Sequence, residues 1–204
     1  MRKQSLILGV TGSIASGKSL VAALFQKCGA AVVSADQLAR EIVRPGSVVL
    51  QQLVERFGAV VLAADGSLDR DRLAQMVFSD QQARIDVNRI THPAIGQLAL
   101  ERLSSLASSG VPLVVYEAPL LFEARAEQRV DRVLVVKVDP ETQLQRLMDR
   151  EGLSPIDAQQ RVDAQLSQEE KLARADYVID NSGSIEATQK QVETLWRQLT
   201  GHEE

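Results

Sequence analysis

A glycine-containing segment between an apolar run and an amphipathic stretch constrains the fold of this chain more than any other feature. Leu6–Val10 is short and apolar, which predicts a buried strand, and the segment Gly12–Ser19 follows it at once. From Lys18 the apolar residues recur at spacings of three and four, which predicts a helix that ends at Gly29. Ala31–Val33 then predicts a second strand. Such a unit requires a right-handed crossover and a parallel sheet.

The segment between strand and helix matches the pattern G-x-x-x-x-G-K-[ST] in the context that this pattern needs. Its two glycines allow backbone angles and close approaches that a Cβ would block. Successive N–H groups can then form an anion nest, reinforced by the helix dipole. Lys18 can reach β- and γ-phosphates, and the Ser19 hydroxyl can ligate Mg²⁺. We therefore predict nucleoside triphosphate binding, although the loop does not indicate what is phosphorylated. The predicted nucleotide-binding residues here are Gly12, Ser13, Ile14, Ala15, Ser16, Gly17, Lys18, Ser19 and Leu20.

Sheet signals return only in the second half of the chain. Val111–Tyr116 and Val133–Val138 are β-branched runs with little alternation, as expected of strands buried on both faces, and Tyr177–Ile179 predicts a last strand. Residues from about 37 to 109 carry helical stripes instead, and Trp196 lies on the apolar stripe of a C-terminal helix. We expect a single α/β domain over residues 1–204, with a three-layer P-loop NTPase fold, a parallel sheet and a helical lobe inserted at about 37–109.

Composition excludes several classes of function. The net charge of −4 creates no global field that would attract nucleic acid. The single cysteine, Cys28, cannot form an internal disulfide, and its helical, apolar neighbours favour a packed core thiol. The N-terminal residues lack the pattern of a signal peptide, and no apolar stretch approaches the roughly 18 residues that span a bilayer. We therefore expect a cytoplasmic protein without nucleic-acid or membrane partners.

Two isolated polar residues each allow more than one interpretation. Asp36 lies just past the predicted second strand, where ligands bind in open parallel sheets. Its carboxylate could accept a proton from an attacking hydroxyl or share a Mg²⁺ shell, or it could cap a helix that begins near Gln37. His92 has no partner at metal-ligand spacing, so zinc is not expected. A structural or helix-capping role for His92 is the simpler interpretation, and a place in an acceptor pocket is the alternative.

Arg146 and Arg150 are four residues apart, so they share one face of a predicted helix. On composition alone, a solvated pair that bridges to Asp149 or Glu151 is the simpler interpretation. In a kinase, paired arginines on a lid would instead clamp the phosphoryl oxygens during transfer.

Several further motifs occur in an order that resembles one known family, the dephospho-CoA kinases. The loop, read as Gly9-Val10-Thr11-Gly12 onward, is similar to the family's G-L-T-G-G-I-G-S-G-K-[ST]. The resemblance covers nearly the whole chain, and the ordered set is more specific than any one motif. The other matching segments are Ala35-Asp36 with Ala39-Arg40-Glu41, Phe57-Gly58, Asp65-Gly66 with Leu68-Asp69-Arg70, Thr91-His92-Pro93-Ala94-Ile95, Pro119-Leu120-Leu121-Phe122-Glu123, Arg161 with Gln165, and Ala175 to Gly183.

This resemblance implies an α/β P-loop kinase that uses ATP and Mg²⁺ to phosphorylate the ribose 3′-hydroxyl of dephospho-CoA, the last step of coenzyme A biosynthesis. It implies that Asp36 is the base for that hydroxyl and that Arg146 lies in a small helical lid, at about 141–170, near the phosphates. The inserted helical lobe becomes the acceptor-binding side. The expected catalytic residues are Asp36, Lys18 and Arg146, with Arg150 on the nucleotide, Ser19 on the metal, and Thr11, Asp36, Arg40, His92, Pro119 and Leu120 on the substrate.

The chain departs from the family pattern at three positions. Ser13 and Ala15 replace two glycines of the loop, which we expect to stiffen it, while the glycines needed most are kept. Ser34 stands where the family usually has the first aspartate of D-A-D, leaving Asp36 as the only carboxylate of that motif. We expect weaker organisation of the metal rather than loss of activity.

Two other functions remain as alternatives. A nucleoside, nucleotide or shikimate-type kinase would share the loop and the lid. A GTP-dependent switch would usually carry an N-K-x-D guanine reader, whereas Asn181 is followed by Ser182-Gly183. The sequence is compatible with a monomer or a small homo-oligomer.

Overall fold

The computed structural model describes residues 5–201, and the chain divides into two compact units. One unit combines the chain up to Ser34 with the chain from Arg102 onward, and the other is Ala35–Glu101. Residues 1–4, which contributed to the exclusion of a signal peptide, lie outside the described residues. Within the described part of the chain, none of the helices combines the length and the apolar character needed to cross a bilayer.

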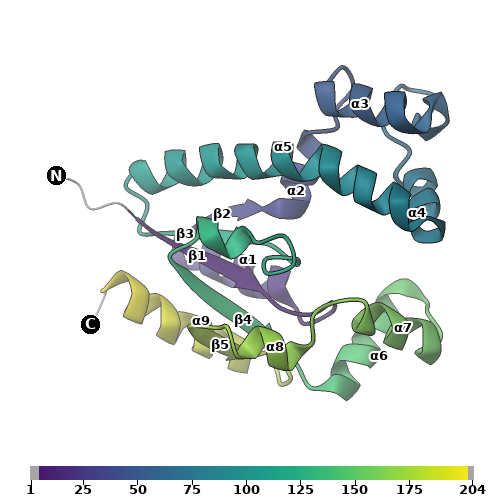
Figure 1. Ribbon diagram of the computed structural model, residues 1–204. Helices are drawn as coiled ribbons and strands as arrows, with labels where there is room; N and C mark the ends of the chain where they lie inside the picture. The colour runs from purple at the N-terminus through teal and green to yellow at the C-terminus, as the bar shows by residue number, and fades with distance from the viewer. Residues whose placement is uncertain (1–4, 202–204) are drawn as a thin grey trace. The chain divides into compact units, whose positions relative to one another are not determined.

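The first unit contains a five-stranded parallel sheet with the order β2-β3-β1-β4-β5 (Figure 1). The predicted parallel sheet is therefore confirmed. Its central strands are almost fully buried, which explains their continuous runs of β-branched residues. Ser34 pairs in register with Glu117, so the last residues of two neighbouring strands lie side by side at the carboxyl edge. The strands are β1 (Leu6–Thr11), β2 (Ala31–Ser34), β3 (Leu113–Glu117), β4 (Arg132–Lys137) and β5 (Tyr177–Asp180).

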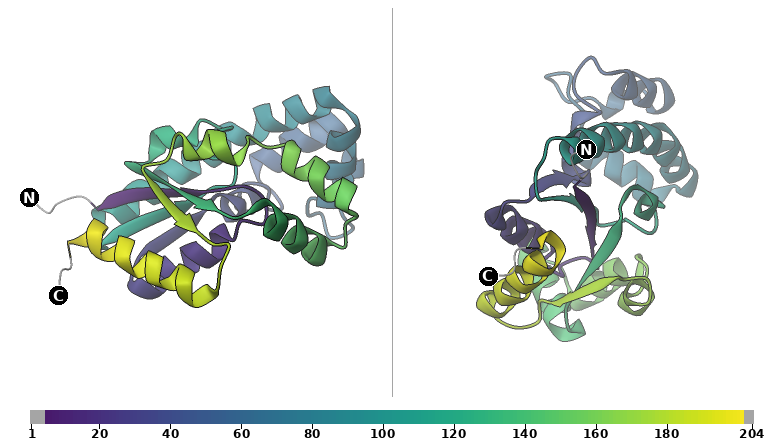
Figure 2. Two further views of the ribbon diagram at one scale, coloured as in Figure 1. Left: turned by 90° about the horizontal axis from the view of Figure 1, so that it is seen from below. Right: turned by 90° about the vertical axis from the view of Figure 1, so that its left-hand side faces the viewer.

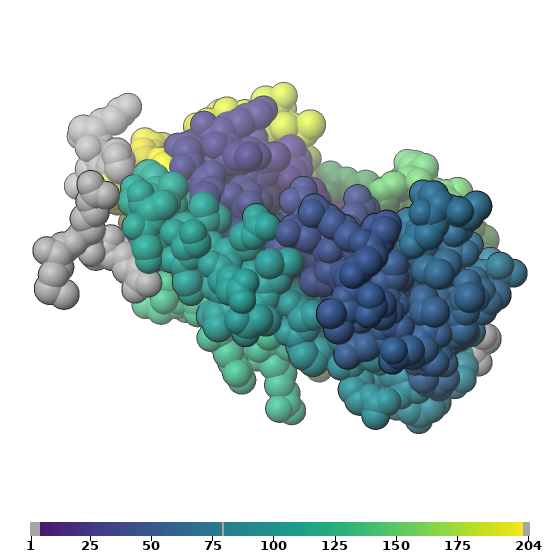
Figure 3. Space-filling view, turned by 90° about the horizontal axis from the view of Figure 1, so that it is seen from above, coloured from purple at the N-terminus to yellow at the C-terminus, as the bar shows by residue number. Residues whose placement is uncertain are grey.

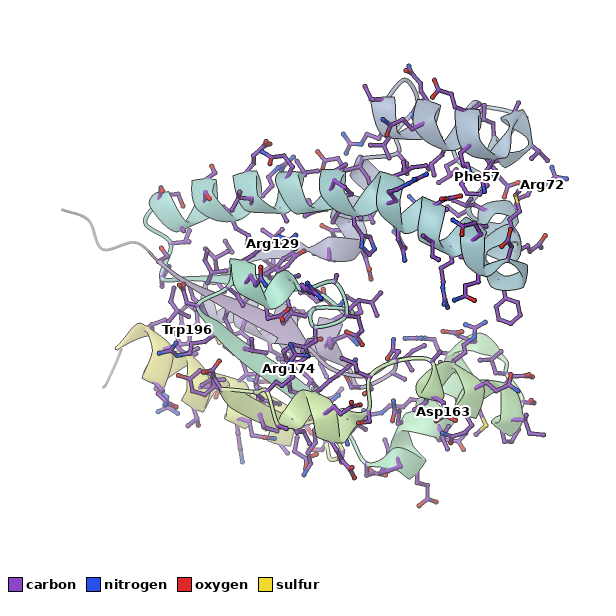
Figure 4. All side chains as sticks on the ribbon, in the orientation of Figure 1. Phe57, Arg72, Arg129, Asp163, Arg174 and Trp196 are labelled. Atoms are coloured by element: carbon purple, nitrogen blue, oxygen red, sulfur yellow. The ribbon has the colours of Figure 1, made fainter. Side chains whose placement is uncertain are left out.

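Helices α1 (Lys18–Cys28) and α9 (Ile185–Thr200) pack together on one face of this sheet (Figure 2). Gly29 ends α1 in a left-handed conformation, as predicted. Trp196, labelled on α9 in Figure 4, packs against the main core, so the apolar stripe predicted for this helix faces the core. Cys28 packs against the same core, and burial, followed by the charge of Glu193, raises the pKa of its thiol.

The other face of the sheet is covered by the short helices η2 (Ala126–Arg129) and α8 (Gln168–Leu172) (Figure 2). An ion pair of 3.1 Å joins the fully buried Lys171 to Glu123. Arg174, labelled in Figure 4, donates to Glu127 at 2.8 Å, and its guanidinium lies 4.0 Å from the centroid of the Phe122 ring. These contacts tie the segment that follows β3 to the region around α8.

Two helices follow β4, where the sequence predicts a lid. α6 (Pro140–Glu151) begins with Asp139, whose carboxylate accepts from the Thr142 amide at 2.9 Å. Pro140 occupies the first turn of α6, where its missing N–H costs nothing. α7 (Pro155–Asp163) starts in the same way, with Ser154 as its cap.

The second unit is helical and has its own small core. Leu53, Phe57 and Leu73, from two of the predicted stripes, belong to it, and helix α3 lies at the surface in the space-filling view (Figure 3). The elements here are α2 (Ala35–Glu41), α3 (Val48–Phe57), η1 (Ala59–Val61), α4 (Arg70–Ser79) and most of α5 (Gln81–Ser108).

Two capping interpretations are wrong in the second unit. Asp36 does not cap a helix at Gln37, because α2 already begins at Ala35 and places Asp36 in its first turn. His92 is not a cap either, because it lies inside α5, a helix of 28 residues that contains Pro93. A proline inside a helix removes one backbone hydrogen bond. Burial of residues on both sides of Pro93, such as Ala83 and Ala99, stabilises the helix despite that loss.

Candidate functional site

The loop between β1 and α1 needs glycine at both of the positions that the sequence singled out. A Cβ on Gly12 would lie 2.4 Å from the carbonyl oxygen of Val136. A Cβ on Gly17 would lie 2.0 Å from Nδ2 of Asn181, and Gly17 also has a φ of +89°. Both distances are shorter than any real contact of a Cβ. The close approach of the loop to the ends of β4 and β5 therefore explains why these two glycines are kept.

The two positions where glycine has been replaced differ from each other. Ala15 has a φ of +60°, in the left-handed region that costs an L-residue roughly 1–2 kcal/mol. Among the described residues, Ser13 is not one of those with positive φ, so it needs no glycine. Its carbonyl accepts from the Ser16 amide at 3.1 Å and from the Lys18 ammonium at 2.9 Å. Of the two replacements, only Ala15 therefore has a backbone conformation that favours glycine.

A side chain from the far end of the chain holds the turn at Gly17. Asn181, which follows β5, donates through Nδ2 to the Ser16 carbonyl at 2.8 Å. Its Oδ1 accepts from the Thr188 hydroxyl at 2.8 Å, so the orientation of the amide is fixed. Asn181 and Thr188 are both almost completely buried. This loop thus depends on α9 as well as on its own glycines.

The segment around Asn181 is itself held by hydrogen bonds. The Ser182 hydroxyl accepts from the Asp139 amide at 2.9 Å, and the Ser182 amide donates to the Asp180 carboxylate at 2.9 Å. Hydrogen bonding to Ser182, followed by the Lys137 ammonium, lowers the pKa of Asp180 below its usual range. Asp180 is therefore a fixed negative charge that aligns the start of this segment.

The Ser16 hydroxyl is a buried polar group inside the loop. Ser16 has no exposed surface, and its Oγ has no hydrogen-bond partner among the described residues. The oxygen lies 2.7 Å from the place that a Cβ on Gly12 would occupy, and that place is itself 2.4 Å from the Val136 carbonyl oxygen, so the hydroxyl faces the end of β4. This contact leaves no room for a side chain at Gly12.

The structure adds a carboxylate that the sequence reasoning missed. Glu117, at the end of β3, accepts from the Ser19 hydroxyl at 2.6 Å. Ser34 lies beside it in register, at the position where the family usually has aspartate. The sequence did offer a signal for this residue, because Glu117 ends an otherwise apolar strand, Leu-Val-Val-Tyr-Glu. A serine hydroxyl and one carboxylate, completed by water and phosphate oxygens, are a donor set that suits Mg²⁺.

The two arginines of α6 lie beside the phosphate loop. Arg146 and Arg150 line a recess of about 260 Å³ together with Ala15, Gly17, Lys18 and Ser19. Arg146 donates to the Asn181 carbonyl at 2.9 Å, which attaches α6 to the segment that covers Gly17. Arg150 pairs with Glu151 at 2.6 Å, so the bridge suggested by composition also exists. The bridge to Glu151 is therefore present at Arg150, and the clamping of phosphoryl oxygens by the pair remains a prediction.

Two glutamines from the same region bind the loop at Ile14. The Ile14 amide donates to Oε1 of Gln165 at 2.8 Å. The Ile14 carbonyl accepts from Nε2 of Gln143 at 2.8 Å. Gln165 was part of a matched motif without a role, and Gln143 was missed, because a glutamine in an amphipathic helix carries no signal of its own.

The remaining predicted substrate residues occupy different environments. Thr11 is fully buried, and its hydroxyl donates to the Pro119 carbonyl at 3.3 Å, while Leu120 is half exposed. In the second unit, Asp36 and Arg40 are exposed on α2, and His92 is exposed on α5. Their roles in binding a substrate remain predictions.

Comparison with known proteins agrees with this geometry. A family model described as dephospho-CoA kinase matches residues 6–187. The chain is 57% identical over 194 residues to a dephospho-CoA kinase of Syntrophotalea carbinolica, covering 95% of this chain and 92% of that protein. It is 50% identical over 190 residues to one of Geobacter sulfurreducens, covering 93% and 96%.

Among solved structures, a dephospho-CoA kinase from Campylobacter jejuni superposes with a TM-score of 0.75 at 30% identity. The match covers 96% of this chain and 97% of that one. The sheet, the phosphate loop and the order of the motifs thus agree with sequence similarity along almost the whole length, and this chain belongs to the dephospho-CoA kinase family.

Proposed function

We propose that this chain transfers the γ-phosphoryl group of ATP to the ribose 3′-hydroxyl of dephospho-CoA, giving coenzyme A. The observation that carries this proposal is the recess at the phosphate loop, where Lys18, Ser19 and the two α6 arginines meet in a chain of this family.

On the nucleotide side, the N–H groups of the loop and the Lys18 ammonium would hold the β- and γ-phosphates. Arg146 and Arg150 would face the transferring group from α6, since both line the same recess as Lys18. Because the transition state of phosphoryl transfer is loose, positioning and charge neutralisation account for most of the catalysis.

On the acceptor side, Asp36 would orient the 3′-hydroxyl and accept its proton. Asp36 is exposed in the first turn of α2, directly after β2, and so follows the carboxyl end of a parallel strand. Arg40, one helical turn further along α2, and His92 are exposed on the same unit and are available to a substrate. We assign the remaining substrate contacts to Thr11, Pro119 and Leu120.

A magnesium ion fits the residues at the edge of the sheet. The Ser19 hydroxyl and the Glu117 carboxylate, 2.6 Å apart, would hold it directly or through water. When bound, the ion would neutralise part of the charge of the phosphate oxygens. Ser34 leaves this edge one carboxylate short of the family pattern, and Glu117 beside it compensates in part.

The test is a panel of acceptors incubated with labelled ATP. Dephospho-CoA, a nucleoside, a nucleoside monophosphate and shikimate would be compared, and the position of the new phosphate would be located by NMR. We expect transfer to dephospho-CoA only, at the 3′-oxygen. Transfer to a nucleoside or to shikimate but not to dephospho-CoA would refute the proposal. Equal binding of GTP and ATP without any transfer would instead support a nucleotide-dependent switch.

The proposed enzyme acts in the cytoplasm as a monomer or a small homo-oligomer. A net charge of −4 gives no support for nucleic acid as a partner. The small-molecule substrates of the proposed reaction are ATP and dephospho-CoA.

A further inference from the structure

Ile14 in the phosphate loop has both of its backbone polar groups bound by side chains from the other end of the sequence. Gln165, 151 residues away, accepts from its amide, and Gln143, 129 residues away, donates to its carbonyl. Both distances are 2.8 Å. Gln143 is only 5% exposed and Gln165 is half-buried. These are therefore shielded contacts with good geometry, of the kind that contribute measurably to structure.

The two amides cannot exchange roles. A backbone N–H only donates and a carbonyl only accepts, so Gln165 must present oxygen to Ile14 and Gln143 must present nitrogen. Each glutamine is therefore held in one orientation, and a side chain of similar length without an amide, such as methionine, would lose the bond while keeping most of the packing.

The bond to Gln143 also locates the arginines of α6. Gln143 precedes Arg146 by three residues on this helix, so the two side chains lie on neighbouring positions of one face. Arg146 reaches the Asn181 carbonyl at 2.9 Å, and Asn181 in turn reaches the Ser16 carbonyl at 2.8 Å. α6 is thus attached to the loop on two sides, at Ile14 directly and at Ser16 through Asn181.

We propose that Gln143 and Gln165 are positioning residues that fasten the lid segment to the phosphate loop at Ile14, so that loop amides and lid arginines hold the triphosphate as one unit. Gln143 acts through Arg146, because both belong to one helix whose distance from the loop is set by the bond to Ile14. Gln165 acts on the loop itself, because it fixes the direction of the Ile14 amide and so the shape of the nest around the phosphates.

This inference rests on the proposed function for the identity of the nucleotide, but its test needs no acceptor. The equilibrium affinity for ATP, with Mg²⁺ present, would be measured by calorimetry for Gln143→Met and Gln165→Met. The matched controls are Gln145→Met on α6 and Gln159→Met on α7, both exposed and bonded only within their own helices in the described contacts. We expect Gln143→Met and Gln165→Met each to weaken ATP binding by roughly three- to tenfold, as expected for one lost hydrogen bond. Each control should change the affinity by less than about twofold.

A double-mutant cycle separates positioning from a general loss of stability. In an Arg146→Ala background, Gln143→Met is expected to weaken ATP binding by less than about twofold more, because its effect passes through the missing arginine. A full, additive effect in that background would overturn the role assigned to Gln143. Wild-type ATP affinity in both Gln143→Met and Gln165→Met would overturn the proposal as a whole.

Hydrogen exchange provides a second readout that does not depend on catalysis. The Ile14 amide should exchange faster in Gln165→Met than in wild-type or in Gln159→Met, because its acceptor is lost. Should Gln143→Met not fold, the half-buried Gln165→Met variant still decides the matter by this readout. If dephospho-CoA proves not to be an acceptor while these results hold, the proposed function fails and the positioning role of the two glutamines stands. If the variants show normal ATP affinity, normal exchange and normal transfer to dephospho-CoA, the proposed function stands and the positioning role fails.

Discussion

The phosphate loop and the helical unit Ala35–Glu101 differ in where their supporting contacts come from. The loop is contacted by Gln143, Gln165 and Asn181, which lie more than a hundred residues away in sequence. The helical unit packs around its own core, and Asp36, the base that we propose, is exposed on it. The difference teaches that the phosphate loop is held by distant parts of the first unit, whereas the residues that we propose for the acceptor are surface side chains.

The largest loss is expected from Lys18→Ala, because it removes the charge that we propose holds the β- and γ-phosphates. Loss of one such preorganised group lowers kcat/KM by about 10²–10³-fold in other enzymes. Steady-state kinetics with ATP and dephospho-CoA would measure it. Lys27→Ala, at an exposed position of the same helix, is the control and should change little. A fall in kcat/KM of less than about tenfold would show that the loop amides bind the phosphates without help from Lys18.

Asp36→Asn tests the other side of the comparison. We expect kcat to fall by about 10²-fold, the low end for general base catalysis, because positioning contributes more than proton abstraction in a loose transition state. The affinity for ATP should hardly change, since Asp36 belongs to the second unit. Gln37→Ala, the exposed neighbour on α2, is the control. A variant with full kcat would remove Asp36 from the mechanism.

Glu117→Gln tests the magnesium site that we propose at the edge of the sheet. Loss of the carboxylate that accepts from Ser19 should raise the Mg²⁺ concentration needed for half-maximal ATP binding by about tenfold. Titration of ATP affinity against Mg²⁺ would measure this without an acceptor. Ser34→Asp, which adds a carboxylate beside Glu117, should lower that concentration. An unchanged titration in Glu117→Gln would confine this residue to supporting the loop.

The smallest effect is expected from Ala15→Gly. Glycine adopts the left-handed φ of this position without strain, although it loses more entropy on folding. The free energy of unfolding should therefore rise by about 0.5–1 kcal/mol. Ala23→Gly, exposed within α1, should lower it by about 1 kcal/mol. Denaturant unfolding would compare the two, and equal losses would mean that Ala15 is not strained.

The sequence predicted the sheet and the phosphate loop because both depend on local patterns. β-branched runs marked the buried strands, and four fixed residues of the loop carried the binding chemistry. The partners of the loop could not be predicted in the same way. Gln143 and Asn181 act through single hydrogen bonds across the fold, and nothing in their own neighbourhoods shows which backbone group they meet.

Helix ends were predicted less well where a residue had two plausible roles. Asp36 resembled the cap of a helix that begins near Gln37, yet α2 starts at Ala35, before Asp36 itself. His92 before Pro93 resembled a boundary, yet burial along α5 outweighs the hydrogen bond that proline removes. In both cases contacts in the folded chain decided between local preferences that were close in energy.

The hydrogen bond from Asn181 to the loop beside Gly17 has a consequence for the order in which the protein folds during synthesis. The Asn181 amide that bonds to Ser16 is 165 residues further along the chain, and the Thr188 hydroxyl that orients this amide comes later still. Because proteins are synthesised from the N-terminus at finite speed, a chain translated only as far as the loop lacks these contacts. The loop therefore gains its full set of supporting hydrogen bonds only after α9 has been synthesised.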